Sequence, residues 1–159
     1  MKFTTVKLLP IFSLAFLLLL GMSSTGCKKE GCTNPKSDNY NPDAKADDGS
    51  CIPWRNKFLG TYTTSGSCIT ELDLPDDNLS VTPSTSDEQK IIFEILGWTW
   101  TGNVTEQFKV EIPEQDFEPD PNTKMQGSGT IDDKGKLTLD LEFGTAPFIV
   151  VCTYECEPL

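Results

Sequence analysis

Leu137-Thr138-Leu139-Asp140-Leu141-Glu142-Phe143 is the stretch that shows most clearly which secondary structure this chain forms. Its leucines occupy every second position and polar side chains fill the positions between them, which is the period of a β-strand with one buried and one solvated face. The segment 108–112 alternates in the same way. Asp133-Lys134-Gly135, just before the quoted stretch, is typical of a hairpin turn. These patterns predict an antiparallel sheet with one face in a core.

Around this stretch the sequence predicts seven or eight short strands and no helix. Segments with the period of a strand are punctuated by Gly, Pro, Asn and Asp, and no run of helical period competes with them. The predicted strands cover residues 58–64, 67–74, 90–96, 99–101, 104–112, 126–131, 136–143 and 148–154, and the predicted surface loops cover 73–89 and 113–123. We therefore expect residues 54–159 to form an all-β antiparallel meander.

The composition excludes several functional classes. The chain has 159 residues, no histidine and a formal net charge of -11. Without imidazole there is no Ser-His-Asp or Cys-His nucleophile and no zinc site that uses histidine. A chain this acidic also lacks the basic face that nucleic acids require. No nucleophile motif or evident pair of acids suggests catalysis, so we expect neither an enzyme nor a nucleic-acid partner.

The N-terminal residues have the pattern of a secretion signal. Two lysines precede an apolar run over 11–20 that is too short to span a membrane, and Ser23-Ser24-Thr25-Gly26 then leads into Cys27. This pattern resembles the signals of bacterial lipoproteins. The resemblance implies that residues 1–26 are removed, that Cys27 carries acyl chains, and that residues 27–31 tether the protein to a membrane. The alternative is an ordinary secretory signal with Cys27 in a disulfide.

Removal of the signal makes the protein still more acidic. It takes away two lysines and no acid, which leaves 11 basic and 24 acidic residues and a net charge of -13. This charge repels anionic lipid headgroups, so we expect the body to stand off from the membrane on its tether. The lipoprotein resemblance implies an outer-membrane location, with the periplasmic and cell-surface faces both open.

Residues 32–51 have too few apolar side chains for a core of their own. Two prolines disfavour a helix and Asp48-Gly49 signals a turn, so a bond between Cys32 and Cys51 must close the segment. A ring of about 20 residues gains roughly 3 kcal/mol in the chain-entropy model. The segment resembles a short cysteine-bounded module of exported Bacteroidetes proteins, which occurs beside many unlike domains. The matching residues are Gly31-Cys32-Thr33, Asn39-Tyr40-Asn41-Pro42 and Asp47-Asp48-Gly49-Ser50-Cys51.

The side-chain oxygens of this module allow two interpretations. Calcium binds six to eight oxygens on a flexible loop, whereas Asx side chains more often form turns with the neighbouring backbone. Ala44 stands where a calcium loop of the EF-hand type has its glycine, and no glutamate closes the loop. Turn formation is therefore favoured. Calcium is the one cofactor that the chain suggests, and its ligands would be Asn39, Asn41, Asp43, Asp47 and Asp48.

Residues 54–156 resemble the lipocalin-like, or calycin-like, domains that follow lipidated cysteines in Bacteroidetes proteins, which implies a small meander barrel. The matching residues are Phe58-Leu59-Gly60-Thr61-Tyr62, Cys68, Ile112-Pro113-Glu114-Gln115, Gly127-Ser128-Gly129-Thr130-Ile131 and Leu137-Thr138-Leu139. An immunoglobulin-like sandwich is the rival, because Cys68, the tryptophans and Tyr154-Glu155-Cys156 imitate its Cys, Trp and Tyr-x-Cys pattern. That fold needs a further strand after its second cysteine, and too little chain follows.

The first and last strands of the meander carry cysteines that can join them. In a closed barrel these two strands are neighbours. We therefore expect Cys68 to bond to Cys152, which follows the apolar run 148–151. Cys156 lies on the same face four residues later and is the substitute partner.

Trp98 and Trp100 are the candidate ligand-binding residues. They stand two positions apart and share one face of a strand, where they can stack on a small apolar or sugar-like ligand or simply fill the core. Core packing is favoured. The expected function is that of a non-enzymatic, lipocalin-like envelope lipoprotein that binds a small ligand. The alternative is a structural or protein-interaction lipoprotein of the outer membrane, with a filled core and an envelope protein as its partner.

Overall fold

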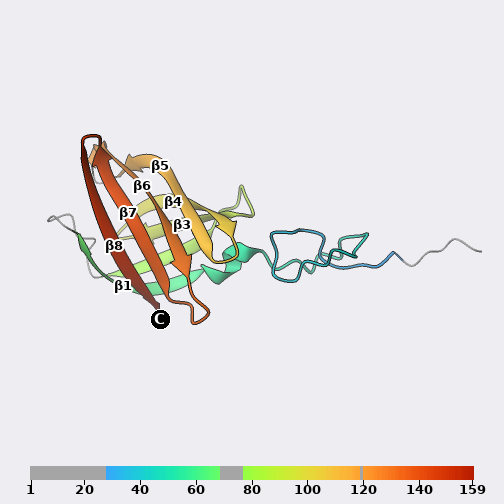
Figure 1. Cartoon of the computed structure of the whole chain (residues 1–159). Helices are drawn as coiled ribbons and strands as arrows, with labels where there is room; N and C mark the ends of the chain where they lie inside the picture. Colours follow the sequence, from blue (N-terminus) through green and yellow to red (C-terminus); the bar gives the residue numbers. More distant parts are fainter. Residues whose placement is uncertain (1–27, 69–76, 119) are drawn as a thin grey trace, which may run out of the picture.

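The computed structural model describes residues 28–68, 77–118 and 120–159. It contains one short 3-10 helix followed by eight strands (Figure 1). Their bounds are η1 Trp54–Lys57, β1 Gly60–Cys68, β2 Asn78–Pro83, β3 Lys90–Ile95, β4 Trp98–Glu106, β5 Lys109–Phe117, β6 Asp120–Ile131, β7 Leu137–Thr145 and β8 Phe148–Pro158.

The eight strands form one closed barrel in which each strand runs antiparallel to the next. The last strand pairs with the first, from Tyr62 opposite Pro158 to Cys68 opposite Cys152. The predicted all-β meander barrel is therefore confirmed. The sandwich alternative is wrong, because a sandwich would consist of two open sheets where this chain forms a single closed one.

Several predicted strand limits are wrong. The predicted strand 104–112 contains the turn between β4 and β5, and the predicted loop 113–123 lies largely in β5 and β6. The predicted loop 73–89 contains β2, in which Leu79 and Val81 point inward and are buried. The prediction failed because this segment is rich in Pro, Asp, Ser and Thr, which are typical of loops. It nevertheless contains a strand that the closed barrel needs between β1 and β3. The predicted strand 67–74 falls mostly outside the described residues.

One end of the barrel, which we call the base, is closed by packed side chains. Leu137, Leu139 and Leu141 of β7 are fully buried, as the alternation predicts. η1 covers this end: Arg55 donates from Nη1 to the carbonyls of Ser84 and Asp87, at 2.9 and 2.7 Å. Phe58, directly after η1, is also fully buried. The base is therefore filled by the protein itself.

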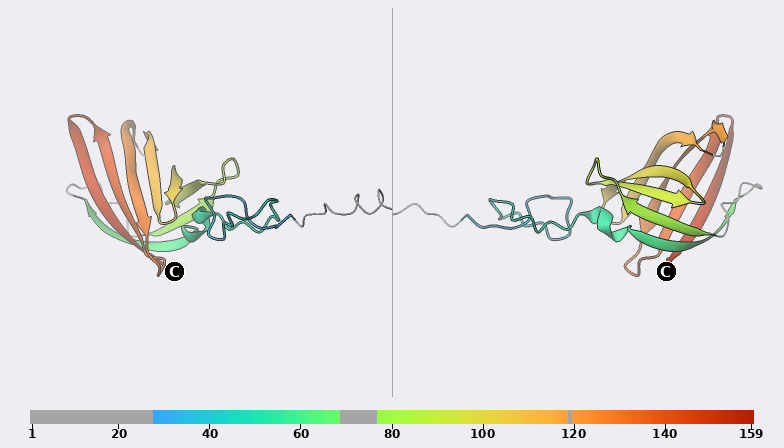
Figure 2. Two further views of the ribbon diagram at one scale, coloured as in Figure 1. Left: turned by 45° about the vertical axis from the view of Figure 1, so that its right-hand side comes forward. Right: turned by 180° about the vertical axis from the view of Figure 1, so that it is seen from behind.

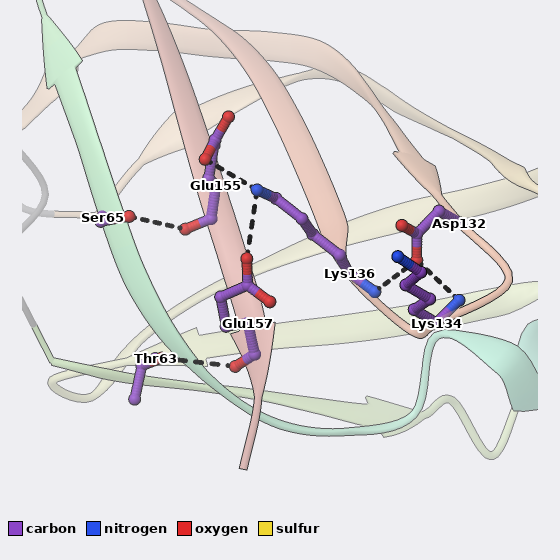
Figure 3. A network of polar contacts seen from close by, with 7 residues as sticks. All are labelled: Thr63, Ser65, Asp132, Lys134, Lys136, Glu155 and Glu157. Atoms are coloured by element: carbon purple, nitrogen blue, oxygen red, sulfur yellow. Dashed lines mark hydrogen bonds and ion pairs between the residues drawn. The ribbon is translucent and has the colours of Figure 1, made fainter.

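Side chains reinforce the position of β8 between β7 and β1 (Figure 3). Lys136 Nζ lies 2.8 Å from Glu155 and 3.1 Å from Glu157. The hydroxyls of Thr63 and Ser65 donate to the carbonyls of Glu157 and Glu155, each at 3.4 Å. Exposed ion pairs of this kind contribute up to about 1 kcal/mol each, so they assist the closure without determining it.

Both predicted disulfides are present. Cys68 and Cys152 join β1 to β8 with their Cα atoms 4.4 Å apart, and Cys32 and Cys51 close the module with theirs 4.8 Å apart. Cys156 is not the partner of Cys68; it is a buried free thiol.

The module lies at the base, on the side of η1 (Figures 1 and 2). Asp38 connects it to the barrel, because its carboxylate accepts hydrogen bonds from Lys57 at 2.5 Å and from Gln107 at 2.9 Å. Lys57 also lies over the ring of Phe108, 5.4 Å from its centroid. The module thus has its own disulfide and a charged contact with the barrel.

We expect the two disulfides to differ in their effect on the barrel. Replacing both Cys68 and Cys152 with Ala should lower the free energy of unfolding by about 3 to 4 kcal/mol. The two cysteines are 84 residues apart in the sequence, so without the disulfide the unfolded chain gains conformational entropy. The measurement is urea denaturation followed by tryptophan fluorescence. The matched control, Cys32→Ala with Cys51→Ala, should leave the transition of the barrel within about 1 kcal/mol. Equal losses in both double variants would contradict this account.

Candidate functional site

The end of the barrel opposite η1, which we call the mouth, brings the candidate tryptophans near other aromatic residues. β1, β3, β5 and β7 end at the mouth, and β4, β6 and β8 begin there. Trp98 opens β4, Phe117 closes β5 and Phe148 opens β8. Residues that are distant in the sequence therefore meet at one rim.

An aromatic row crosses the interior beside this rim. Trp98 meets Phe117 edge to face with their ring centroids 5.7 Å apart, and Phe117 meets Phe143 in the same way at 5.1 Å. Phe117 and Phe143 are buried, while Trp98 is half-buried and packs against the core. The row gives the upper interior three rings with fixed relative orientations, which can form one wall of a ligand site.

Trp100 lies deeper than Trp98. It is 4% exposed and stacks on Phe93 of β3 with their centroids 5.4 Å apart. Its indole Nε1 is buried and has no hydrogen-bond partner among the described residues. A buried donor without a partner costs about 1–3 kcal/mol. Trp100 therefore fills the core, as the sequence favoured, and also presents an unused donor inside the barrel.

A hollow of about 270 Å³ lies at the mouth, at the end of the aromatic row. Phe143, Phe148 and Val150 supply its apolar wall, and Asn122 and Thr123 of β6 supply polar groups. Phe148 is 83% exposed, which is unusual for so large an apolar side chain. The β7–β8 hairpin brings Phe148 close to Gly144, where a Cβ would meet the Phe148 carbonyl oxygen at 2.2 Å. The hollow is thus lined by Phe143, the ring at one end of the aromatic row.

A second concave region, which we call the outer groove, lies on the outer wall and has a different chemistry. It measures about 450 Å³ and is lined mainly by polar side chains, including Glu111, Glu114, Gln126, Asp140 and Glu142. Several of these groups already have partners: Gln126 donates to Glu142 at 2.8 Å, and Asp140 accepts from Thr153 at 2.7 Å. It contains no aromatic side chain on which an apolar or sugar-like ligand could stack.

The candidate calcium ligands of the module serve its turns. Asn41 accepts from the backbone N–H of Asp43, Asp47 from that of Gly49, and Asn39 from that of Ile52. Hydrogen bonds from the hydroxyl and the backbone of Ser50 lower the pKa of Asp48, and Asp43 pairs with Lys29 at 3.0 Å. Within the described part of the chain, no three cysteine, aspartate or glutamate side chains gather as metal ligands.

Three of the shifted pKa values belong to turns and to packing. A hydrogen bond from the Thr123 hydroxyl lowers the pKa of Asp120, and backbone N–H groups of Lys136 and Lys134 lower that of Asp132 (Figure 3). Burial raises the pKa of the Cys156 thiol to about 12, with the charge of Glu157 adding to the effect. None of these groups lines the hollow at the mouth.

Cys27, which the lipoprotein resemblance predicts to carry acyl chains, lies outside the described residues. Among the residues that are described, no helix has the length and apolar character needed to cross a membrane. No protein-family model, curated protein or solved structure matches this chain.

The sequence pattern identified Trp98 and Trp100 as candidate site residues. It did not identify Phe117, Phe143 and Phe148, which lie in the aromatic row or at the hollow. The alternation in 137–143 does place Phe143 on the inner face with the leucines. Phe117 stood in a segment that reads as a loop, so no pattern assigned it a face. The approach of Phe148 to the rim depends on the β7–β8 hairpin.

We expect Cys156 to make stability fall at high pH. Its folded-state pKa of about 12 lies above its ordinary value, so the folded protein holds this proton where the unfolded chain has lost it. Stability from this group is complete below about pH 8.5 and declines toward pH 12, by up to about 1.4 kcal/mol per pH unit. Urea denaturation of the wild type and of Cys156→Ala between pH 8 and 11 measures it. The difference between the two proteins should shrink as pH rises, and a difference independent of pH would contradict the assignment.

Proposed function

We propose that this protein is an exported, lipid-anchored envelope protein whose lipocalin-like barrel binds a small apolar ligand at its mouth. The observation that carries the proposal is the hollow of about 270 Å³ that is lined by Phe143 and bordered by the 83% exposed Phe148. Phe143 contacts Phe117, and Phe117 contacts Trp98, so the aromatic row begins at the wall of the hollow. Apolar pockets with a few polar groups are the usual form of small-molecule sites.

The packing of the base limits the size of this ligand. Eight-stranded barrels are barely wide enough for side chains or one small ligand, and here Leu137, Leu139 and Leu141 occupy the lower interior. The ligand therefore has about the size of one or two rings and binds above them. Trp100 does not line the hollow, but its buried Nε1–H has no partner among the described residues. We propose that the ligand extends below the hollow and carries one hydrogen-bond acceptor, because an acceptor that reached this donor would satisfy it.

No catalytic role is part of the proposal. The chain has no histidine, and Asn122, Thr123 and Thr145 are the polar side chains that line the hollow. Such a site supports binding and selection by shape.

The alternative function is that of a protein-interaction lipoprotein. The observation that favours it is the outer groove, which is larger than the hollow and rich in carboxylates. A surface of this kind suits a polar, basic protein partner better than an apolar molecule.

The position of the module supports a defined orientation on the membrane. The tether precedes the module, and the module lies at the base, held by Asp38. An anchor at Cys27 would therefore put the base toward the lipid and leave the mouth facing away from it. This arrangement suits a protein that takes its ligand from the aqueous side.

We expect 1-acetylnaphthalene, an apolar bicyclic ketone, to bind saturably and to change tryptophan emission. Phe148→Ala should weaken this binding roughly tenfold, because it removes an aromatic wall of the site from an exposed position that does not support the core. Ile149→Ala is the matched control, since Ile149 is the next residue on β8 and does not line the hollow.

A matched ligand tests the role of Trp100. 1-Ethylnaphthalene has the same rings without the carbonyl, so the wild type should prefer the ketone. Trp100→Phe should abolish this preference by removing the indole donor.

Absence of saturable binding to the wild type, or equal losses in Phe148→Ala and Ile149→Ala, would count against a site at the mouth.

The anchor has its own test. Cells that express the protein and grow with labelled palmitate should yield labelled protein in the membrane fraction, because two or more acyl chains hold a protein stably on a bilayer. Cys27→Ser should lose the label and leave the membrane fraction, while Cys156→Ser should retain both. A wild type without label would refute the lipid anchor. Protease treatment of intact cells then distinguishes the cell-surface face from the periplasmic one.

A further inference from the structure

The backbone hydrogen bonds between β4 and β5 stop before these strands reach the mouth. Going toward the mouth, the described backbone pairs between these strands end at Asn103 opposite Glu111. β4 nevertheless begins five residues earlier in the chain, at Trp98, and β5 continues to Phe117. We call the remaining stretch, residues 98–102 of β4 facing 112–117 of β5, the seam.

Pro113 explains why the backbone ladder stops. Val104 donates its N–H to Gln89 on the β3 side, so the odd-numbered residues of β4 direct their N–H and C=O groups toward β5. The next pair after Asn103 and Glu111 would be Thr101 with Pro113. Pro113 has no N–H, so the Thr101 carbonyl lacks a backbone donor opposite it. β5 also bulges here, since its register with β6 shifts between Ile112 and Gln115.

The side-chain amide of Gln115 takes the place of the missing pair. Its Oε1 accepts the Thr101 N–H at 2.9 Å. Its Nε2 donates to the carbonyl of Thr101 at 2.9 Å and to that of Pro113 at 3.0 Å. One amide thus bonds all three backbone groups that a Thr101–Pro113 pair has: the N–H and carbonyl of Thr101 and the carbonyl of Pro113.

Glu118 continues this pattern one step nearer the mouth. Its carboxylate accepts the Thr99 backbone N–H at 3.0 Å and the Thr99 hydroxyl at 3.3 Å. Gln115 and Glu118 are side chains with several rotatable bonds, whereas a ladder is made of fixed backbone groups. Opening here therefore breaks the side-chain contacts of Gln115 and Glu118 and the ring contact of Trp98 with Phe117, but no backbone ladder. The seam thus belongs to the part of the wall that opens at low free energy.

The seam lies beside the aromatic residues that would receive a ligand. Trp98 and Trp100 belong to its β4 side and Phe117 to its β5 side, and all three pack on the core. Because β4 begins and β5 ends at the mouth, the seam extends the mouth down the wall of the barrel. A rim that can part here admits a molecule wider than the hollow of about 270 Å³.

We propose that the β4–β5 seam is a side entrance to the barrel, held shut by Gln115 and Glu118, through which a small apolar ligand reaches Trp98 and Phe117. This inference rests on the proposed function for its ligand, but the bonding of the seam can be tested without one.

Hydrogen exchange of single amides, followed by NMR on the full mature chain, tests whether the contacts of Gln115 and Glu118 hold the seam more weakly than a backbone ladder would. The amide protons of Thr99 and Thr101 should exchange at least about tenfold faster than that of Val104, which donates to backbone in the same strand. Gln115→Ala should speed the exchange of Thr101 further. Pro113→Val, which supplies the missing N–H, should slow it. Equal protection of the three amides in the wild type would overturn the proposal.

Stopped-flow tryptophan fluorescence with 1-acetylnaphthalene tests the entrance. Gln115→Ala should raise the association rate several-fold and Pro113→Val should lower it, while Gln126→Ala, which removes a surface amide bonded to Glu142, should leave it unchanged. Saturable binding with the same rate in all four proteins would overturn the side entrance and leave the proposed function standing. No saturable binding to the wild type would overturn the proposed function and the entrance with it, whereas the exchange pattern would still show whether the seam is weakly bonded.

Discussion

The pairing of β1 with β8 is the contact on which the rest of this structure depends. The two strands come from opposite ends of the domain, and their ladder runs from Tyr62 opposite Pro158 to Cys68 opposite Cys152, where a disulfide fixes it. Once these strands meet, no edge is left exposed and the alternating side chains have a defined inside. Without this contact, the leucines of β7 would cover one face of an open sheet.

The two ends of the closed barrel differ in how their interiors are covered. At the base, η1 and Phe58 seal the interior, and Asp38 of the module contacts Lys57 and Gln107 there. At the mouth no comparable cover is present among the described residues, and Phe148 is exposed beside a row of rings. The wall itself is weaker on that side, since Pro113 interrupts the ladder and Gln115 replaces it with a side-chain contact. Among the described residues, the base is thus the covered end of the barrel and the mouth is the uncovered one.

The sequence predicted those features that depend on local pattern or on a single long-range constraint. The alternation in 137–143 predicted β7. The Cys68–Cys152 bridge was predicted because a closed meander makes its first and last strands neighbours, and the Cys32–Cys51 bridge because residues 32–51 have too few apolar side chains for a core. β2 was missed, since Leu79 and Val81 are two apolar residues among Pro, Asp, Ser and Thr. The β4–β5 turn at Gln107 and Phe108 was missed because the period of two continues through it without a glycine. The seam could not be predicted, because the substitution of Gln115 for a Thr101–Pro113 pair depends on the register between two strands.

We propose that ligand binding takes place at the mouth. Amide chemical shifts of the ¹⁵N-labelled mature protein during titration with 1-acetylnaphthalene test it most directly. We expect changes concentrated at Trp98, Phe117, Phe143 and Phe148, with the amides of η1 and the module unchanged. Shifts centred on the outer groove around Glu111 and Asp140, or on η1, would contradict it.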